Sequence, residues 1–425
     1  MAVEMAGPWD RLERRGILVG AAVAEALRHV PVSSFLPPEL RAAAMTDAPL
    51  PTALREPRVV LPAPRSLAML LQMLEPEKGV SVLLLGSVGG YVEALLARLV
   101  APAPVTVWEE DGALASAARA SLDALGLGER VTFVSAPTPG ARFDRVTATD
   151  AIQRLAPAAR EAIADMGFAV FRRYHEAFGF VKVLRGGDEF VELSTTEFLP
   201  PEAAEADTGG DTASIDLGRE LLLARMLENV WHGRPESEPE REFLAVVEDT
   251  YAKPEERPPM EADELLRYDA AKRLFHIGYI YQGAGDWEAS IEAYAASIAV
   301  SPTAEAYTFL GWVYSFEDRH VEAIAECERA IAVDPSFGNP YNDIGAYLIE
   351  LKRLDEAIPW FEKAKTAKRY CCYFYPYSNL GRVYMMKGMR EKARREFEEA
   401  LRINPEYHYA REMLRRVDRG EDYIA

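Results

Sequence analysis

The last third of the chain repeats one pattern of apolar and small residues four times. In each unit an aromatic or aliphatic residue precedes Leu-Gly or Ile-Gly, and another apolar residue follows three positions later; the four glycines are Gly278, Gly311, Gly345 and Gly381. They lie 33, 34 and 36 residues apart. Twelve residues after each glycine a small residue is followed, four positions on, by an apolar one; these pairs are Ser290 and Tyr294, Ala323 and Cys327, Ala357 and Phe361, and Ala393 and Phe397. A fixed period of this length indicates a repeat architecture.

The spacing within each unit predicts two amphipathic helices, because residues three and four apart share one helix face. Glycine and the small residues are expected where the two helices approach closely. A single helical hairpin cannot bury its apolar face alone, so neighbouring units are expected to stack into an α-solenoid with a concave binding surface. Residues 407–417 have the pattern of a closing helix with a charged outer side.

The first half of the chain alternates short apolar runs with helical patterns. Val80 to Leu85 is a continuous apolar run that ends at a glycine, as expected of a buried parallel strand. Further strands are predicted at 105–108, 131–134, 145–148 and 168–171, a hairpin at 178–184 and 189–198, and helices at 64–74, 91–99 and 114–125. This alternation predicts a doubly wound α/β sheet of the Rossmann-like type. Ahead of it, residues 9–30 have a helical pattern and residues 30–37 an extended one.

These patterns divide the chain into three parts. Residues 1–205 are expected to form the α/β domain, residues 206–262 an acidic helical linker with a helix at 217–231, and residues 263–425 the solenoid with its closing helix. Between Glu236 and Ala262 nine acidic residues face three basic ones. The proline-rich stretch from Lys253 to Pro259 is the expected hinge.

Composition narrows the class of partner. The 425 residues carry 48 basic and 67 acidic side chains, a net charge of −19, which argues against binding to nucleic acid or to an anionic membrane. No run of about 18 apolar residues and no export signal is visible. Three cysteines are too few for a disulfide framework, so a reducing cytoplasm is expected. Cys371 and Cys372 are adjacent, which leaves open a redox pair or two simply packed thiols.

The repeat resembles the tetratricopeptide repeat, whose order of Leu-Gly, Tyr, Ala, Phe and Pro has the same spacing. The resemblance implies that the first helix of each unit faces the concave side and binds a protein or peptide. The matching positions, expected to be exposed, are Phe275, Tyr279, Thr308, Trp312, Asn339, Asn342, Ser378 and Arg382. Trp312 and Arg382 are of the types that most often dominate interfaces. Because the set lacks a cluster of Lys and Arg, we expect an internal peptide or a folded surface rather than a C-terminal carboxylate.

A second resemblance covers roughly the first two hundred residues. The segment ALRHVPVSSFLPPELRAAAMTDAPLP at 26–51, and VLLLGSVGGY at 82–91, resemble protein-L-isoaspartate O-methyltransferases. The resemblance implies an S-adenosylmethionine site in which Gly86, Gly90 and Tyr91 match the family's glycine loop and Glu109 holds the ribose hydroxyls. If the domain is inactive, no cofactor is expected.

The same comparison shows departures from the family's motifs. Leu84 replaces a glutamate and Val88 a glycine, and a β-branched residue would cost roughly 1 to 2 kcal/mol if that position needs a positive φ. Ala136 replaces an acidic residue expected near the adenine. Pro62 stands where a serine hydroxyl is implied beside the acceptor carboxylate, and proline has neither hydroxyl nor amide hydrogen.

Two hypotheses from different classes follow. The first is a protein-binding scaffold with a degenerate methyltransferase-like domain and no catalytic residues. The second is an S-adenosylmethionine-dependent protein carboxyl methyltransferase whose repeats recruit the substrate. Neither the six scattered histidines nor the three cysteines have metal-ligand spacing, so no metal site is predicted. Sequence does not identify the partner or the oligomeric state.

Overall fold

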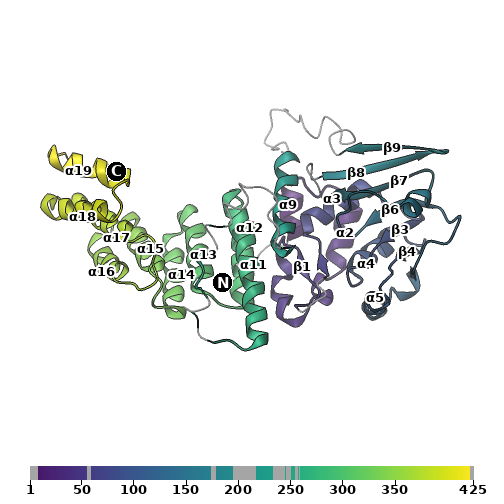
Figure 1. Cartoon of the computed structure of the whole chain (residues 1–425), viewed down its shortest axis with the longest axis horizontal. Helices are drawn as coiled ribbons and strands as arrows, with labels where there is room; N and C mark the ends of the chain where they lie inside the picture. Colours follow the sequence, from purple (N-terminus) through teal and green to yellow (C-terminus); the bar gives the residue numbers. More distant parts are fainter. Residues whose placement is uncertain are drawn as a thin grey trace. The chain divides into compact units, whose positions relative to one another are not determined.

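The computed structural model describes residues 8–54, 59–173, 179–194, 217–232, 245, 250–253, 257 and 259–421. The chain forms two compact units, Met1–Val246 with Pro259–Ile280, and Val247–Pro258 with Tyr281–Ala425. Figure 1 shows the sheet of the first unit and the helical pairs of the second. The division falls inside helix α11 (Ala262–Gly283), and most of the predicted linker lies outside the described residues.

The first unit is built on a seven-stranded sheet, which confirms the predicted doubly wound fold. The strands lie in the order β5-β4-β3-β6-β7-β8-β9, and their bounds are β3 (Val82–Leu85), β4 (Val105–Trp108), β5 (Val131–Val134), β6 (Phe143–Ala148), β7 (Ile163–Arg173), β8 (Gly179–Gly186) and β9 (Glu189–Ser194). The first five pair in parallel, whereas β8 and β9 are antiparallel. The outer ends of the predicted hairpin, at 178 and 195–198, lie outside the described residues.

The helices of this unit begin where the sequence supplies a start signal. Pro64 and Pro157 stand at the first turns of their helices, where the missing N–H costs nothing, and the Asp111 carboxylate accepts the N–H groups of Ala113 and Leu114. The helices are α1 (Pro8–Arg14), α2 (Ala21–His29), α3 (Pro64–Leu74), α4 (Tyr91–Leu99), α5 (Gly112–Ala124), α6 (Pro157–Glu161) and α9 (Leu217–His232).

The prediction of an extended segment at residues 30–37 is wrong. The chain forms two 3₁₀ helices, η1 (Val32–Phe35) and η2 (Pro38–Met45), before a short pair of strands, β1 (Leu50–Pro51) and β2 (Val60–Leu61). Proline fixes φ at a value that suits a 3₁₀ turn as well as an extended chain, so the prolines alone did not decide between them. The turns bury Phe35 in the core.

A buried ion pair fixes this segment to helix α3. Arg65 donates from its backbone N–H and its Nε to the two oxygens of Asp47, at 2.9 and 2.7 Å, and both side chains are fully buried. Burial opposes ionisation of Asp47, but the charges of Arg65 and Arg11 outweigh it and hold its pKa below the usual range.

Helix α11 groups with the first unit up to Ile280, although the sequence pattern assigns it to the repeats. Arg273 donates to the carbonyl oxygens of Val230 and Trp231, at 2.5 and 3.2 Å, and its guanidinium lies 5.5 Å from the centre of the Trp231 ring. These contacts with α9 explain the grouping.

The second unit consists of stacked helical pairs, as the repeat predicts. Its helices are α12 (Trp287–Val300), α13 (Ala304–Phe316), α14 (His320–Val333), α15 (Asn339–Glu350), α16 (Leu354–Lys365), α17 (Phe374–Met386), α18 (Arg390–Ile403) and α19 (His408–Asp418). The repeat glycines are required for close approach: a Cβ on Gly345 would lie 2.6 Å from the Phe361 ring, and one on Gly381 would lie 2.7 Å from the Phe397 ring.

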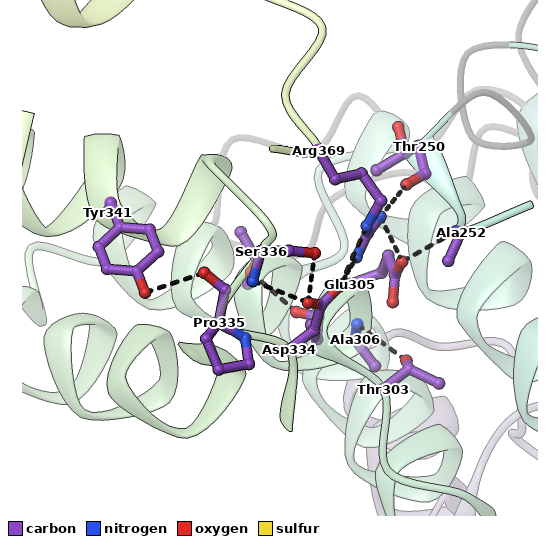
Figure 2. Close-up of polar contacts among 12 residues, drawn as sticks. Thr250, Ala252, Thr303, Glu305, Ala306, Asp334, Pro335, Ser336, Tyr341 and Arg369 are labelled. Carbon is purple, nitrogen blue, oxygen red and sulfur yellow. Dashed lines mark hydrogen bonds and ion pairs between the residues drawn. The ribbon is translucent and has the colours of Figure 1, made fainter. Parts of the chain in front are cut away.

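One arginine connects three stretches of this unit. Arg369, in the connection between α16 and α17, contacts Glu305 at 2.8 Å and Asp334 at 2.7 Å, and it donates to the carbonyl oxygen of Thr250 at 3.1 Å (Figure 2). Glu305 also accepts the N–H of Ala252. The Arg369 backbone pairs with the loop after α14, donating to the oxygen of Ser336 and accepting from Gly338, each at 2.9 Å.

Removal of this guanidinium should destabilise the second unit strongly. Glu305 is only 4% exposed, and burial already raises its pKa against the opposing charge of Arg369. Arg369→Met leaves that carboxylate buried without its cation, a loss of about 3 kcal/mol. Urea unfolding of the full chain, followed by circular dichroism, measures it. Glu305→Gln added to Arg369→Met should recover part of the loss.

Arg353→Met is the matched control, since Arg353 and its partner Glu356 are both exposed. It should leave the unfolding midpoint nearly unchanged. Equal shifts in the Arg353 and Arg369 variants would show that the buried contacts add nothing.

Candidate functional site

The carboxyl edge of the parallel sheet carries a glycine loop at the point where the strand order reverses. Strand β3 pairs with β4 on one side and β6 on the other, and open α/β sheets bind ligands outside the strand ends at such a point. In the loop after β3, Gly86, Gly89 and Gly90 all have positive φ, at 80°, 81° and 99°. A Cβ on Gly86 would lie 2.8 Å from the Thr149 hydroxyl, which follows β6.

Glu109 holds this loop from the end of β4. Its two carboxylate oxygens accept the backbone N–H of Ser87 at 2.9 Å and that of Asp111 at 2.8 Å. A carboxylate has about four lone-pair positions, so each oxygen keeps capacity for a ligand hydroxyl. The half-buried Glu109 therefore lies where the resemblance expects a ribose partner, and it also fixes the loop.

Glu93 is a part of the site that sequence reasoning missed. It lies in the first turn of α4, is fully buried, and accepts a short hydrogen bond from the Ser87 hydroxyl, while its Oε2 has no hydrogen-bond partner in the structure. Burial raises its pKa to about 7, and the nearby charge of Glu109 adds to the effect. The sequence signal that could have revealed Glu93 is the presence of one acidic residue among the apolar residues of α4.

Tyr91 does not face a ligand. Its side chain is 2% exposed and its ring centre lies 5.2 Å from that of Phe35. A Cβ on the neighbouring Gly90 would lie 3.4 Å from the same Phe35 ring. Tyr91 thus supports the loop from inside the core, while Gly86 and Gly90 shape its backbone.

The condition under which Val88 would be costly, a positive φ at that position, is not met. Val88 is not among the residues with positive φ, and its side chain is 1% exposed, so it packs inward instead of filling the loop. The glycines at 86, 89 and 90 occupy the left-handed positions in its place. The loop therefore keeps an open backbone despite the substitution.

The other departures leave parts of the site without polar groups. Leu84 and Pro62 are buried, and Ala136 is exposed beyond β5. At the end of β7 the buried Arg172 donates to the carbonyl oxygen of Thr149 at 2.6 Å. The loop and Glu109 fit the ribose and chain of S-adenosylmethionine, whereas the adenine and acceptor positions lack the polar side chains that the resemblance implies.

The solenoid presents fewer of the predicted groove residues than expected. Phe275 and Thr308 are fully buried, Ser378 is 1% exposed and Asn342 is 8% exposed, so their expected exposure is wrong. They lie on helix faces that pack against neighbouring helices. Tyr279, Trp312, Asn339 and Arg382 are half-buried.

Polar side chains join α13, α15 and α17, the first helices of three successive repeats. Trp312 donates from its indole nitrogen to Asp343 at 2.5 Å, Asn342 donates to the other Asp343 oxygen at 3.3 Å, and Asn379 donates to Asn342 at 3.0 Å. Burial raises the pKa of Asp343 to about 7, against these hydrogen bonds. Arg382 pairs with Glu350 at 2.9 Å. Trp312 and Arg382 thus have structural partners already.

A pocket of about 600 Å³ opens beside the Arg369 contacts. It is lined by Ile331, Asp334, Pro335, Ser336, Tyr341, Trp360, Lys363, Thr366, Ala367 and Lys368. The Tyr341 hydroxyl donates to the Pro335 oxygen at 3.1 Å, as Figure 2 shows, and its ring centre lies 6.2 Å from that of Trp360. Lys363 lies 4.2 Å over the Trp360 ring, and Lys363 and Lys368 are exposed. The pocket therefore combines aromatic walls with a cationic rim.

Comparison with family models identifies both parts. Residues 9–153 match the model of protein-L-isoaspartate(D-aspartate) O-methyltransferase. Residues 304–337, 339–371 and 374–407 match tetratricopeptide repeat models. These three ranges cover α13 to α18. No helix in the part of the chain that the structure describes has the length and apolar character needed to cross a lipid bilayer.

Individual relatives match the first unit. The chain is 32% identical to the protein-L-isoaspartate O-methyltransferase of Pyrobaculum arsenaticum over 198 residues, 45% of this chain and 95% of that protein. It is 38% identical to the Aeropyrum pernix enzyme over 118 residues, 28% of this chain and only 44% of that protein. A Plasmodium falciparum structure of this family, in complex with S-adenosyl-L-homocysteine, is 14% identical with a TM-score of 0.38, covering 45% of this chain and 94% of that one.

The buried carboxyl of Glu93 should make stability depend on pH. In the folded state its pKa is raised from 4.5 to about 7. The contribution of the protonated carboxyl to the free energy of unfolding is therefore full below about pH 4.5 and is lost as pH rises through 7. Glu93→Gln stays neutral. The free energy of unfolding of this variant, relative to that of wild type, should therefore rise by on the order of 1 to 3 kcal/mol between about pH 5 and pH 8. Urea unfolding at both pH values measures the difference.

Glu110→Gln, at an exposed neighbouring position, is the control and should leave the pH dependence unchanged. Parallel curves for wild type and Glu93→Gln would contradict the buried neutral carboxyl.

Proposed function

Because this chain belongs to the protein-L-isoaspartate O-methyltransferase family and continues into tetratricopeptide repeats, we propose that it is a cytoplasmic protein-interaction scaffold. In this proposal the repeats bind a protein or peptide and the methyltransferase-like unit no longer transfers methyl groups. The observation that carries it is the pocket lined by Tyr341 and Trp360 among others, which has the size and the apolar walls of a ligand site.

The charges of the pocket favour an acidic ligand. Asp334 is engaged by Arg369 and Ser336, whereas Lys363 and Lys368 lie exposed at the rim. Two exposed lysines at one rim would attract the carboxylates of an acidic ligand. Aromatic walls would bind an apolar side chain, and the lysines would bind neighbouring carboxylates of the same peptide.

The loss of transfer chemistry is supported by the acceptor and adenine positions. Pro62 is buried and has no hydroxyl, and Ala136 has no polar side chain. Each lost hydrogen bond to a charged group costs roughly 1.5 to 3 kcal/mol, and alignment of two reactants contributes roughly 7 to 11 kcal/mol of barrier lowering. Losses at both positions together would leave little catalysis.

A second candidate function is a protein carboxyl methyltransferase that uses S-adenosylmethionine. The observation that favours it is the intact glycine loop, with positive φ at Gly86, Gly89 and Gly90 and with Glu109 held against Ser87. When bound, the cofactor would supply the methyl group, and Glu109 would hold its ribose. The repeats would then deliver the protein substrate.

An assay with purified full-length chain, labelled S-adenosylmethionine and an isoaspartyl peptide separates the two functions. We expect no turnover above a control without protein. Pro62→Ser alone should not rescue it, because Ala136 and Leu84 still lack polar groups. Calorimetry with S-adenosyl-L-homocysteine measures binding separately, with Glu109→Gln as control. Wild-type turnover that Glu109→Gln abolishes would establish the methyltransferase instead.

The pocket is tested with a displayed random-peptide library selected on the full chain. Enriched peptides should carry acidic residues beside an aromatic or aliphatic one. Lys363→Glu with Lys368→Glu should weaken their binding by at least about tenfold, since charge reversal replaces attraction with repulsion. Lys352→Glu, an exposed lysine outside the pocket, is the matched control. Equal weakening by the control, or no enrichment, would refute the pocket as the binding site.

A further inference from the structure

Two adjacent thiols lie in the connection between α16 and α17, at residues 366–373. The Sγ atoms of Cys371 and Cys372 are 2.9 Å apart; Cys371 is exposed and Cys372 half-buried. The third cysteine, Cys327, is fully buried in α14, and burial raises its pKa. Only the adjacent pair is therefore accessible to reagents in solution.

The pair is close enough to form a disulfide with little movement. A disulfide has an S–S distance of about 2.05 Å, so the two sulfurs need to approach by roughly 0.9 Å. Neighbouring Cα atoms are about 3.8 Å apart, below the usual range of about 4.4 to 6.8 Å for disulfides. The ring that closes is accordingly strained, and strained exposed disulfides are the ones that small thiols readily reduce.

The flanks of the pair are fixed. Arg369 is held by its ion pairs and backbone bonds, Tyr370 is buried, and the Tyr373 hydroxyl donates to the Ala367 oxygen at 2.5 Å. The Cys372 oxygen accepts the N–H of Tyr375 at the start of α17. This anchoring keeps the second thiol beside the first, so closure within the chain is favoured over attack by an outside thiol.

We propose that Cys371 and Cys372 form a thiol–disulfide exchange site that is oxidised by disulfides of small thiols such as glutathione. One thiolate attacks the glutathione disulfide, forms a mixed disulfide and releases one glutathione thiolate. The neighbouring thiolate then attacks the protein sulfur of the mixed disulfide and releases the second glutathione. The two protein thiols lose two electrons and two protons in total, and the two glutathione molecules gain them. Excess small thiol reverses both steps.

The hydrogen bond that Cys372 shares with Cys371, together with burial, raises the pKa of Cys372, because it stabilises the protonated Cys372 thiol. Ionisation of both thiols together is thus disfavoured, so exchange in this proposal begins with a single thiolate. This does not affect the second step, because mixed-disulfide formation removes one of the two titrating sulfurs.

The site is tested on full-length reduced protein. The protein is treated with glutathione disulfide and then with maleimide, and its intact mass is measured. Reduced protein should take two maleimides when folded and three when unfolded. Oxidised protein should carry no glutathione. It should take no maleimide when folded and one maleimide when unfolded, and after reduction the folded protein should again take two maleimides. Cys371→Ser and Cys372→Ser should each retain one glutathione, whereas Cys327→Ser should still close its disulfide. Stable glutathione on wild type, or two maleimides on folded protein after oxidation, would overturn the proposal.

Discussion

The guanidinium of Arg369 makes the contacts on which the second unit depends most. One side chain satisfies Glu305 at the start of α13, Asp334 after α14 and the backbone at Thr250, while its own backbone pairs with Ser336 and Gly338. Ordinary repeat packing relates each helix to its nearest neighbours only. Arg369 adds a connection that spans more than one helical repeat. It also places residues 366–368 as one wall of the pocket.

In the first unit the backbone scaffold is retained, whereas several side chains differ from those that the resemblance implies. The backbone of the glycine loop, the Glu109 contacts and the reversal of strand order are those of a ligand site. The substitutions at Pro62, Ala136 and Leu84 affect side chains only, and a fold tolerates such changes where packing is preserved. The buried Glu93 adds a carboxyl whose pKa burial raises to about 7, whereas the family's motif has its acid on the strand instead. Membership in the fold therefore does not by itself decide activity here.

Periodicity predicted the regular elements because it reports directly which face of an element is buried. The strands at 105–108 and 131–134 and the helices at 64–74 and 91–99 have the predicted bounds. Sequence could not assign exposure at Thr308 or Ser378, since that depends on which neighbour covers each helix face. It also could not show that Val88 packs inward, because the loop moves its left-handed positions to Gly89 and Gly90. Long-range contacts such as Arg369 with Glu305, 64 positions apart in the chain, leave no local pattern.

The connection between α16 and α17 limits how this solenoid can be engineered. Tetratricopeptide units are often treated as interchangeable modules, because most contacts are between neighbours. Here one eight-residue connection, 366–373, contains part of a pocket wall, the Arg369 side chain and the adjacent thiols. A consensus unit substituted for the fourth repeat would have to keep this connection unchanged, or the second repeat, α13 and α14, would lose the contacts that Arg369 makes with Glu305 and Asp334. The natural boundary for recombination therefore lies after residue 373 rather than at the end of α16.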